Sequence, residues 1–421
     1  MSNGNRLPRG NGIVIAPIPP ITRRLRKRIR DRARAEPSTD QLRAIGDSFF
    51  RGDPLMDAVV DWMIAHGVPA TKPLFDSALE RGIAAVADAP DALRALFAQV
   101  DHPPPWVDAA RLESGARFSG IAGTVGLDVL RDGGLLPGYL ASAVNQTLIL
   151  TKALEKGPQK RVAETTKWWI DCTRPGGMAR FADGFKTTLQ VRLIHAFVRR
   201  HVGRLPQWQA ETYGIPVNQG DMTATNMVFS AQFLLGQRLL GVIITRSEGA
   251  DVMHLWRYIG WLMGIDEQWL YDSEDAARIA LYQNLLTQPP PDETSRQLGA
   301  ALADEPLQRH YGRFHKLKGH WNRAKHLSIA RLFLAATEMR ALGLSRWTLP
   351  WYPLLTLAPR FLWHALHRVI PGGKERLIRR GLARQRQYLD VLFGGQARQV
   401  TAVPIANGHS PHSLTAHSAN R

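Results

Sequence analysis

The strongest constraint in this sequence is the spacing of its apolar residues, which recur every three or four positions along most of the chain. That spacing is the period of an amphipathic α-helix, and the alternation typical of strands is scarce. Capping and breaking residues divide the pattern into segments. The predicted helices are residues 39–50, 54–66, 72–86, 90–99, 107–131, 137–155, 158–172, 179–203, 221–246, 249–263, 266–286, 293–316, 318–342 and 372–395. The sequence therefore predicts an all-α protein, folded as a single multi-helix bundle domain.

Charge separates a nearly neutral body from two basic ends. Of the 421 residues, 44% are apolar, which is enough for a large core. The formal net charge is +18, yet residues 1–35 hold ten Lys/Arg against one acid, and residues 360–398 hold nine against two. Basic ends of this kind favour an anionic membrane surface or nucleic acid as partner, rather than a basic groove through the fold.

We expect three parts in the chain. Residues 1–36 form a basic, partly disordered N-terminal arm, residues 37–400 form the helical domain, and residues 401–421 form a disordered polar tail. In the arm, apolar residues recur every four positions from Ile21 to Ala33, through Leu25 and Ile29. This narrow stripe belongs either to a solvated basic arm or to a helix lying on an anionic membrane surface.

The sequence also bears on location. We find no secretory signal, and no uncharged apolar segment of the length that crosses a bilayer. The nearest such segment, residues 347–363, contains three prolines and Arg360, and the single cysteine, Cys172, is typical of a reducing compartment. We therefore expect a cytoplasmic protein with peripheral membrane contact through its basic ends. Nucleic acid is the less favoured partner.

Several common catalytic motifs are absent. The chain has no phosphate-binding glycine loop, no dinucleotide fingerprint and no HExxH motif. No glutamate stands three positions before a histidine, so the paired Glu-x-x-His signature of carboxylate di-iron bundles is missing as well. The candidate chemistry therefore has to come from isolated residues within the helices.

His195 is the first such residue. It lies in VRLIHAFVRR, residues 191–200, within a segment that is apolar around almost its whole circumference and is therefore expected to be buried. A buried imidazole needs a hydrogen-bond partner, such as a backbone carbonyl, or a metal. Arg192 and Arg199 lie three positions before and four positions after it, on the same helix face. This arrangement also suits haem, because iron would bind the imidazole and the propionates would pair with arginine.

A second group of residues lies on the preceding predicted helix. Arg161, Thr165 and Trp168 are spaced by four and three positions, so they share one face. A guanidinium and a hydroxyl above a metal would polarise bound dioxygen, and Trp168 with Trp169 would keep the cleft apolar. The alternative is a solvent-exposed arginine beside an ordinary threonine of the helix interior.

Several stretches, taken in their order, resemble the superfamily of latex clearing protein (rubber oxygenase) and the mycophenolic-acid-pathway oxygenases. They are GDPLMDAVV (52–60), PPWVDAARLESG (104–115), R-x-x-x-T (161–165), VRLIHAFVR (191–199), W-x-x-x-x-x-GIPVNQGD (208–221) and WRYIGWLMGI (256–265). The resemblance implies an all-α fold with haem b, an iron cofactor, in a pocket between helices. It also implies His195 as the proximal iron ligand, Arg161 and Thr165 on the distal side, and Arg192 and Arg199 near the haem.

Two positions depart from the latex-cleaving members of that superfamily. Those members carry a lysine just before the distal threonine, where this chain has Glu164. They also carry a catalytic glutamate on the preceding helix, where an ungapped reading places Asn145. An amide cannot take up a proton as a carboxylate can. The latex-cleaving members are, in addition, secreted.

These observations lead us to expect a haem-dependent oxygenase that oxidises or cleaves an apolar, unsaturated, isoprenoid-like substrate with dioxygen. Two alternatives stay open at this point. One is a haem-binding protein without turnover, which the loss of the distal carboxylate favours. The other is a cofactor-free protein that binds membrane or nucleic acid through its basic ends.

Overall fold

The computed structural model describes residues 20–29, 31–151 and 157–396, and within these ranges it contains helices and no strands. The predicted all-α architecture is therefore confirmed. The predicted tail, residues 401–421, and residues 1–19 of the predicted arm lie outside the described residues.

The helices follow one another with short connections. The N-terminal helices are α1 (Pro20–Arg26), α2 (Arg32–Ala35), α3 (Thr39–Ser48), α4 (Pro54–His66), α5 (Val68–Arg81), α6 (Asp91–Val100), α7 (Ala109–Gly120), α8 (Thr124–Leu130), α9 (Leu136–Gly138), α10 (Ser142–Leu150), α11 (Pro158–Thr173) and α12 (Asp183–Val202). The C-terminal helices are α13 (Ala210–Tyr213), α14 (Gln219–Met227), α15 (Phe233–Leu239), α16 (Arg246–Leu262), α17 (Glu274–Leu286), α18 (Glu293–Asp304), α19 (His315–Phe333), α20 (Ala336–Ala341), α21 (Trp351–Val369) and α22 (Gly373–Phe393). Shorter turns are η2 (Ile83–Ala85), η5 (Glu267–Trp269) and η6 (Glu305–Gln308), and two π-helical turns are η3 (Arg131–Leu135) and η4 (Val228–Gln232).

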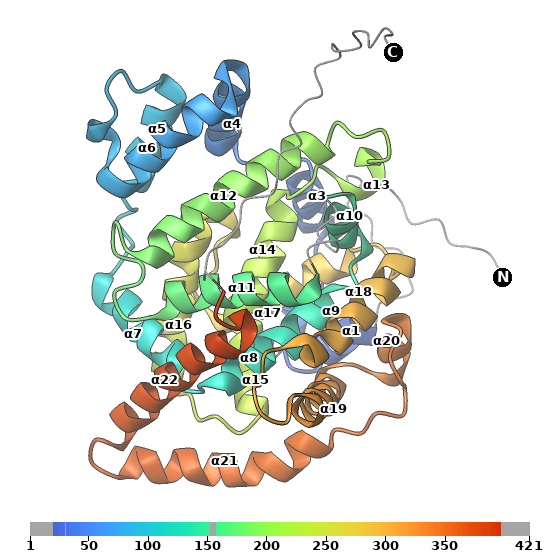
Figure 1. Cartoon of the computed structure of the whole chain (residues 1–421). Helices are drawn as coiled ribbons and strands as arrows, with labels where there is room; N and C mark the ends of the chain where they lie inside the picture. The colour runs from blue at the N-terminus through green and yellow to red at the C-terminus, as the bar shows by residue number, and fades with distance from the viewer. Residues whose placement is uncertain (1–19, 30, 152–156, 397–421) are drawn as a thin grey trace, which may run out of the picture.

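Figure 1 shows how these helices are arranged. The helices α11, α12, α14 and α16 lie near the middle of the molecule, α4 to α6 project at one corner, and α21 runs along the opposite edge. The core is formed mainly by buried Leu, Ile, Val, Met and aromatic side chains from most of these helices.

Several predicted helices are interrupted in the structure, among them those predicted at 107–131, 137–155, 221–246, 293–316 and 318–342, and two of these show why. The helix predicted at 107–131 divides into α7 and α8 at Gly123, whose φ of +55° is readily adopted only by glycine. The helix predicted at 221–246 passes from α14 through the π-helical turn η4 into α15 and ends at Leu239. Apolar spacing could not reveal either interruption, because one glycine or one π-helical turn leaves the pattern almost unchanged.

One long helix, α21, was not predicted. The prolines of its segment indicate a break, because proline lacks a backbone donor. Pro350 caps the helix and Pro353 lies in its first turn, where backbone N–H groups have no partner within the helix. Only Pro359 interrupts the interior, and the helix continues past it to Val369.

The described part of the N-terminal arm packs against the body of the protein. Leu25, Ile29 and Ala35 are buried in the main core, where α1 and α2 contact α17. Two residues of the stripe expected to face solvent or a membrane, Leu25 and Ile29, therefore face protein, while Ala33 at its end is exposed. A narrow stripe on a basic helix is compatible with any apolar surface, so its spacing alone could not identify the partner.

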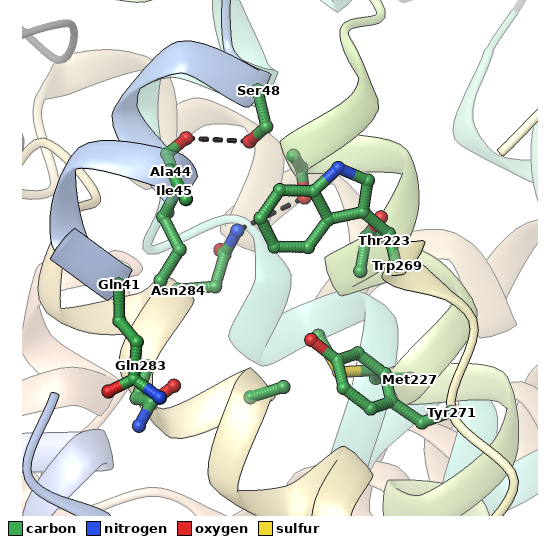
Figure 2. Close-up of a pocket in the computed structure, with 12 residues that line it drawn as sticks. Gln41, Ala44, Ile45, Ser48, Thr223, Met227, Trp269, Tyr271, Gln283 and Asn284 are labelled. Carbon is green, nitrogen blue, oxygen red and sulfur yellow. Dashed lines mark hydrogen bonds between the residues drawn. The ribbon is translucent and has the colours of Figure 1, made fainter. Parts of the chain in front are cut away.

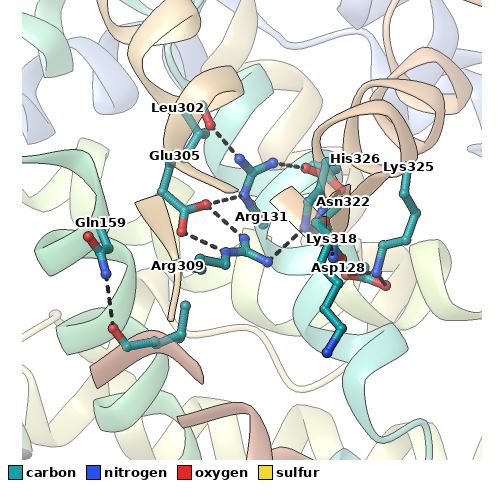
Figure 3. Close-up of polar contacts among 12 residues, drawn as sticks. Asp128, Arg131, Gln159, Leu302, Glu305, Arg309, Lys318, Asn322, Lys325 and His326 are labelled. Carbon is teal, nitrogen blue, oxygen red and sulfur yellow. Dashed lines mark hydrogen bonds and ion pairs between the residues drawn. The ribbon is translucent and has the colours of Figure 1, made fainter. Parts of the chain in front are cut away.

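A buried ionic network holds η3, η6 and α19 together (Figure 3). Glu305 accepts hydrogen bonds from Arg309 Nε and Nη2, both at 2.7 Å, and from Arg131 Nε at 3.2 Å. The side chains of Glu305 and Arg309 are at most 1% exposed. Because two guanidinium groups share one carboxylate away from water, each charge depends on the others for compensation.

His326 connects the same network to a second carboxylate. Its Nε2 atom lies 3.1 Å from Arg309 Nη1, and its Nδ1 atom lies 2.7 Å from Asp132 Oδ2. Since a guanidinium only donates, Nε2 accepts and Nδ1 carries the proton that is donated to Asp132. Burial, together with the nearby charges of Arg131 and Arg309, lowers the pKa of His326 well below its usual range, which is consistent with this neutral tautomer.

Replacing Glu305 with glutamine should lower the free energy of unfolding by about 3–5 kcal/mol, because Arg309 would stay buried without its carboxylate and Arg131 would keep only Asp132. Asp304→Asn is the matched control at the next position, since its ion pair with Arg323 is exposed and contributes at most about 1 kcal/mol. Denaturant titration measures both losses. Equal losses in the two variants would show that the network does not stabilise the fold.

Candidate active site

The two helices that carry the predicted site, α11 and α12, follow one another in the chain and pack together as an antiparallel pair (Figure 1). Near the turn that joins them, Trp168 Nε1 donates to Thr188 Oγ1 at 3.1 Å. Cys172 Sγ lies 3.3 Å from the same hydroxyl oxygen. These contacts fix how far one helix is displaced along the other.

Two predicted site residues lie at similar distances along their helices from this contact. Thr165 lies seven residues before Cys172, and His195 lies seven residues after Thr188. Seven helical residues rise about 10 Å, so Thr165 and His195 each lie about 10 Å along their own helix from the shared contact. Thr165 is exposed, and Arg161 is half-buried without a hydrogen bond or ion pair to the described residues.

His195 has the properties of an available metal ligand. Its Nδ1 atom is buried and has no hydrogen-bond partner among the described residues. Burial, with a further contribution from the charge of Arg199, lowers the pKa of His195 to about 4. The imidazole is therefore neutral at pH 7, which is the state that binds a metal. The buried His254 differs, because its Nε2 atom already accepts a hydrogen bond from the backbone N–H of Asp108 at 3.0 Å.

Arg192 and Arg199 each pair with an acid at the start of α4. Arg192 Nε and Nη2 donate to the two carboxylate oxygens of Asp53 at 2.6 and 2.8 Å, and Arg192 is only 2% exposed. Arg199 Nε donates to Asp57 at 3.0 Å, and its Nη1 donates to a backbone carbonyl at 2.6 Å. Both arginines therefore have carboxylate partners within the protein, and a contact with a haem propionate stays a prediction.

The acids Asp53 and Asp57 were not predicted as part of the site. The sequence did indicate that the two acids belong together, because they lie four residues apart at the beginning of a predicted helix and so share one face. What the sequence could not supply was the pairing, since Asp53 and Arg192 are 139 residues apart.

An aromatic cluster lies about one helical turn from Thr165. Trp168, one helical turn further along α11, meets Phe229 edge-on at a centroid distance of 5.3 Å and Trp256 at 5.8 Å. Phe229 and Trp256 stack at 4.9 Å with almost parallel rings. The prediction that Trp168 contributes to an apolar wall agrees with this packing, and Phe229 and Trp256 are further members that the helical pattern did not single out.

Asn145 lies on α10 and is fully buried. Its side-chain N–H group donates to the carbonyl of Tyr139 at 2.8 Å and to Ser295 Oγ at 3.2 Å, which fastens α10 to α18. An amide held in this way positions helices and offers no carboxylate for proton transfer.

A separate cavity of about 170 Å³ opens between α3, α14 and α17 (Figure 2). Its polar lining consists of neutral amide and hydroxyl groups, among them Ser48 and Gln283. Thr223 Oγ1 and Trp269 Nε1 are buried there without a partner among the described residues. The cavity is large enough for water or a small neutral molecule to satisfy both groups. None of the predicted site residues lines it.

A profile of the family described as "ER-bound oxygenase mpaB/B'/Rubber oxygenase, catalytic domain" matches residues 127–370, which are more than half of the chain. The chain belongs to this family. The resemblance predicted from the sequence is thereby confirmed, and the matched range contains both α11 and α12.

Two known proteins are similar to this chain, one in sequence and one in fold. The rubber oxygenase of Streptomyces sp. (strain K30) is 24% identical over 229 residues, which are 53% of this chain and 55% of the relative. The matched part thus spans about half the length of that relative. A structure of latex clearing protein in the closed state matches with a TM-score of 0.58 and 19% identity, covering 80% of this chain and 91% of that one. At this identity the match establishes a common fold.

Gly184 tests the contact between α11 and α12. A Cβ atom at Gly184 would lie 2.6 Å from the carbonyl oxygen of Asp171 and 2.5 Å from that of Gly177, so Gly184→Ala should force the helices apart. We expect a loss of about 1–3 kcal/mol in the free energy of unfolding. Gly138→Ala is the control, because a Cβ at Gly138 meets no atom within 4 Å. A Gly184→Ala protein as stable as the control would contradict the close packing.

Proposed function

We propose that this chain is a haem-dependent oxygenase that oxidises or cleaves an apolar, unsaturated, isoprenoid-like substrate with dioxygen. Membership of a family of oxygenases supports the reaction class. The observation that carries the cofactor assignment is His195, a neutral imidazole with a buried ring nitrogen that lacks a partner among the described residues. Haem b, when bound, supplies the iron that activates dioxygen.

Two features support a haem group held by His195. A macrocycle needs an apolar cleft, and the wall formed by Trp168, Phe229 and Trp256 is close to α12 through the contact of Trp168 with Thr188. His195 would hold the iron through its imidazole. Its low pKa keeps the imidazole free of a competing proton over the physiological range.

Arg161 and Thr165 are the residues that we propose act on dioxygen. A guanidinium keeps its charge in an apolar cleft and continues to donate hydrogen bonds, and a threonine hydroxyl can donate or accept. The two residues lie one turn apart on α11, so they can stabilise negative charge that develops in one small volume. The aromatic cluster of Trp168, Phe229 and Trp256 begins about one turn further along the same helix.

We propose that Arg192 and Arg199 act on the site mainly as positioning residues. Their ion pairs with Asp53 and Asp57 hold α12 against α4 on both sides of His195. Removing either acid would free a guanidinium charge beside the imidazole and change the orientation of the helix.

The cofactor assignment is tested by replacing His195 with alanine. We expect the variant to lose haem or to hold it weakly, with a lower or displaced Soret absorption band after reconstitution. His201→Ala is the matched control, because His201 is exposed on the same helix and should leave the spectrum unchanged. Full haem content and an unchanged Soret position in His195→Ala would refute the assignment.

The oxygenase activity is tested at Arg161 and Thr165. Arg161→Ala and Thr165→Ala should retain haem and lose roughly 10²–10³-fold in turnover, because each removes a donor to developing negative charge. Oxygen uptake with an unsaturated isoprenoid, and mass spectrometry of the products, measure the loss. Lys160→Ala is a suitable control, since Lys160 lies on the exposed side of the same helix. Turnover equal to that of the parent in both variants would remove these residues from the mechanism.

A haem-binding protein without turnover is the second candidate, and Asn145 favours it. The resemblance drawn from the sequence implies a carboxylate in latex-cleaving relatives where Asn145 stands, and here the amide is committed to Tyr139 and Ser295. A protein that binds haem through His195 and consumes no oxygen with any unsaturated lipid would establish this second function.

A further inference from the structure

The helix α21 exposes its large apolar side chains, whereas an ordinary amphipathic helix buries them. Its buried residues are Pro353, His364 and His367, whereas its large apolar side chains face outward. We define the outer face of α21 by its exposed apolar residues, which are Leu354, Leu355, Leu357, Phe361, Leu362, Trp363, Leu366 and Val369. A surface helix in water normally buries its apolar stripe, so a continuous outward stripe indicates an apolar partner.

Polar contacts hold the inner side of α21 on the protein. Arg368 donates to both carboxylate oxygens of Glu248, at 2.9 and 2.6 Å, and to the carbonyl of Ile243 at 2.7 Å. Arg360 donates to the carbonyl of Leu240, which precedes α16. The helix is therefore fixed in its orientation by hydrogen bonds and ion pairs, and the outward direction of its leucines is not the result of a loosely attached segment.

The apolar surface continues beyond α21. Trp347, 76% exposed, and Leu349 precede the helix, and Trp321 of α19 lies 5.3 Å from Trp351 between ring centroids. Figure 1 shows α21 at the edge of the molecule, with the other helices on one side of it. Tryptophan at the rim of an apolar surface is typical of the boundary between lipid and water.

Positive charge accompanies this surface. Residues 346–396 contain nine arginines or lysines and two carboxylates. The guanidinium of Arg346 lies 4.4 Å from the ring of Trp347, and that of Arg380, on α22, lies 5.9 Å from the ring of Trp363. Arg379 and Arg384 are exposed on the same helix as Arg380. Cations therefore border the outer face at positions where lipid headgroups would lie.

We propose that the outer face of α21 docks the protein onto an anionic lipid bilayer, with the helix lying in the plane of the interface. No helix among the described residues is long and apolar enough to cross a membrane, so the proposed contact is peripheral. A second copy of the chain is the competing occupant. A symmetric contact through this face would bring the same basic border onto itself, whereas an anionic bilayer complements it. The proposal does not depend on the oxygenase function.

The apolar part is tested by flotation with vesicles of phosphatidylcholine alone and mixed with phosphatidylglycerol. The parent should bind the mixed vesicles, and Leu355→Gln with Leu362→Gln should bind at least about tenfold more weakly, because two exposed leucines no longer enter the bilayer. Ile64→Gln with Leu74→Gln is the matched control, since these exposed apolar residues lie on α4 and α5. A parent that binds neither vesicle, or an α21 variant that binds like the parent, would overturn the proposal.

The charged part is tested by Arg379→Gln with Arg380→Gln. Each exposed arginine near the surface contributes about fivefold to binding of anionic lipid at low salt, and the contribution should fall as salt is raised. An unchanged preference for anionic vesicles would contradict the role of the basic border.

Light scattering tests for the competing occupant, because a parent dimer that the Leu355/Leu362 variant converts to monomer would assign the face to a second copy instead. All variants alter exposed side chains, and unchanged thermal melting confirms that they fold.

Discussion

The buried ion pair between Arg192 and Asp53 sets the position of the helix on which the candidate site depends. Both side chains are nearly inaccessible to water, and the two hydrogen bonds hold the guanidinium and the carboxylate in one plane. Breaking a buried pair from one side leaves an uncompensated charge, so neither residue can change alone without a large loss of stability. The rotation of α12, and with it the direction in which His195 points, follows from this contact.

This protein buries several ion pairs and exposes a row of large apolar side chains. Carboxylates and guanidinium groups are paired inside the molecule, in the network around Glu305 and again beside α12. Leucines and tryptophans lie outside it, along α21. The two features are consistent, because the arginines of α21 point inward to partners such as Glu248 and leave the opposite side of the helix to apolar residues. Ionic contacts within the protein thus determine which surface is left apolar.

Local pattern predicted the local structure well and the long-range contacts poorly. The period of apolar residues identified α4, α11 and α12 closely, and it identified His195 as a titratable group in an apolar helix. It failed for α21, because prolines near a helix start do not break it, and for the stripe of Leu25 and Ile29, because spacing does not say which apolar surface a stripe meets. The partners of Arg192 and Arg199 lie far away in the sequence, so pairing with protein carboxylates could not be told from pairing with a ligand.

The lone sulfhydryl of the chain is enclosed where α11 meets α12. Cys172 is completely buried, and burial raises the pKa of its thiol to about 12, so almost no thiolate exists at neutral pH. Oxidation to sulfenic acid and disulfide exchange both require that thiolate, so the protein is protected at its most oxidisable position. For the same reason, a cysteine introduced at any exposed position would be the only one to react with a maleimide, and spin or fluorescent labels could be attached to single sites without first removing Cys172.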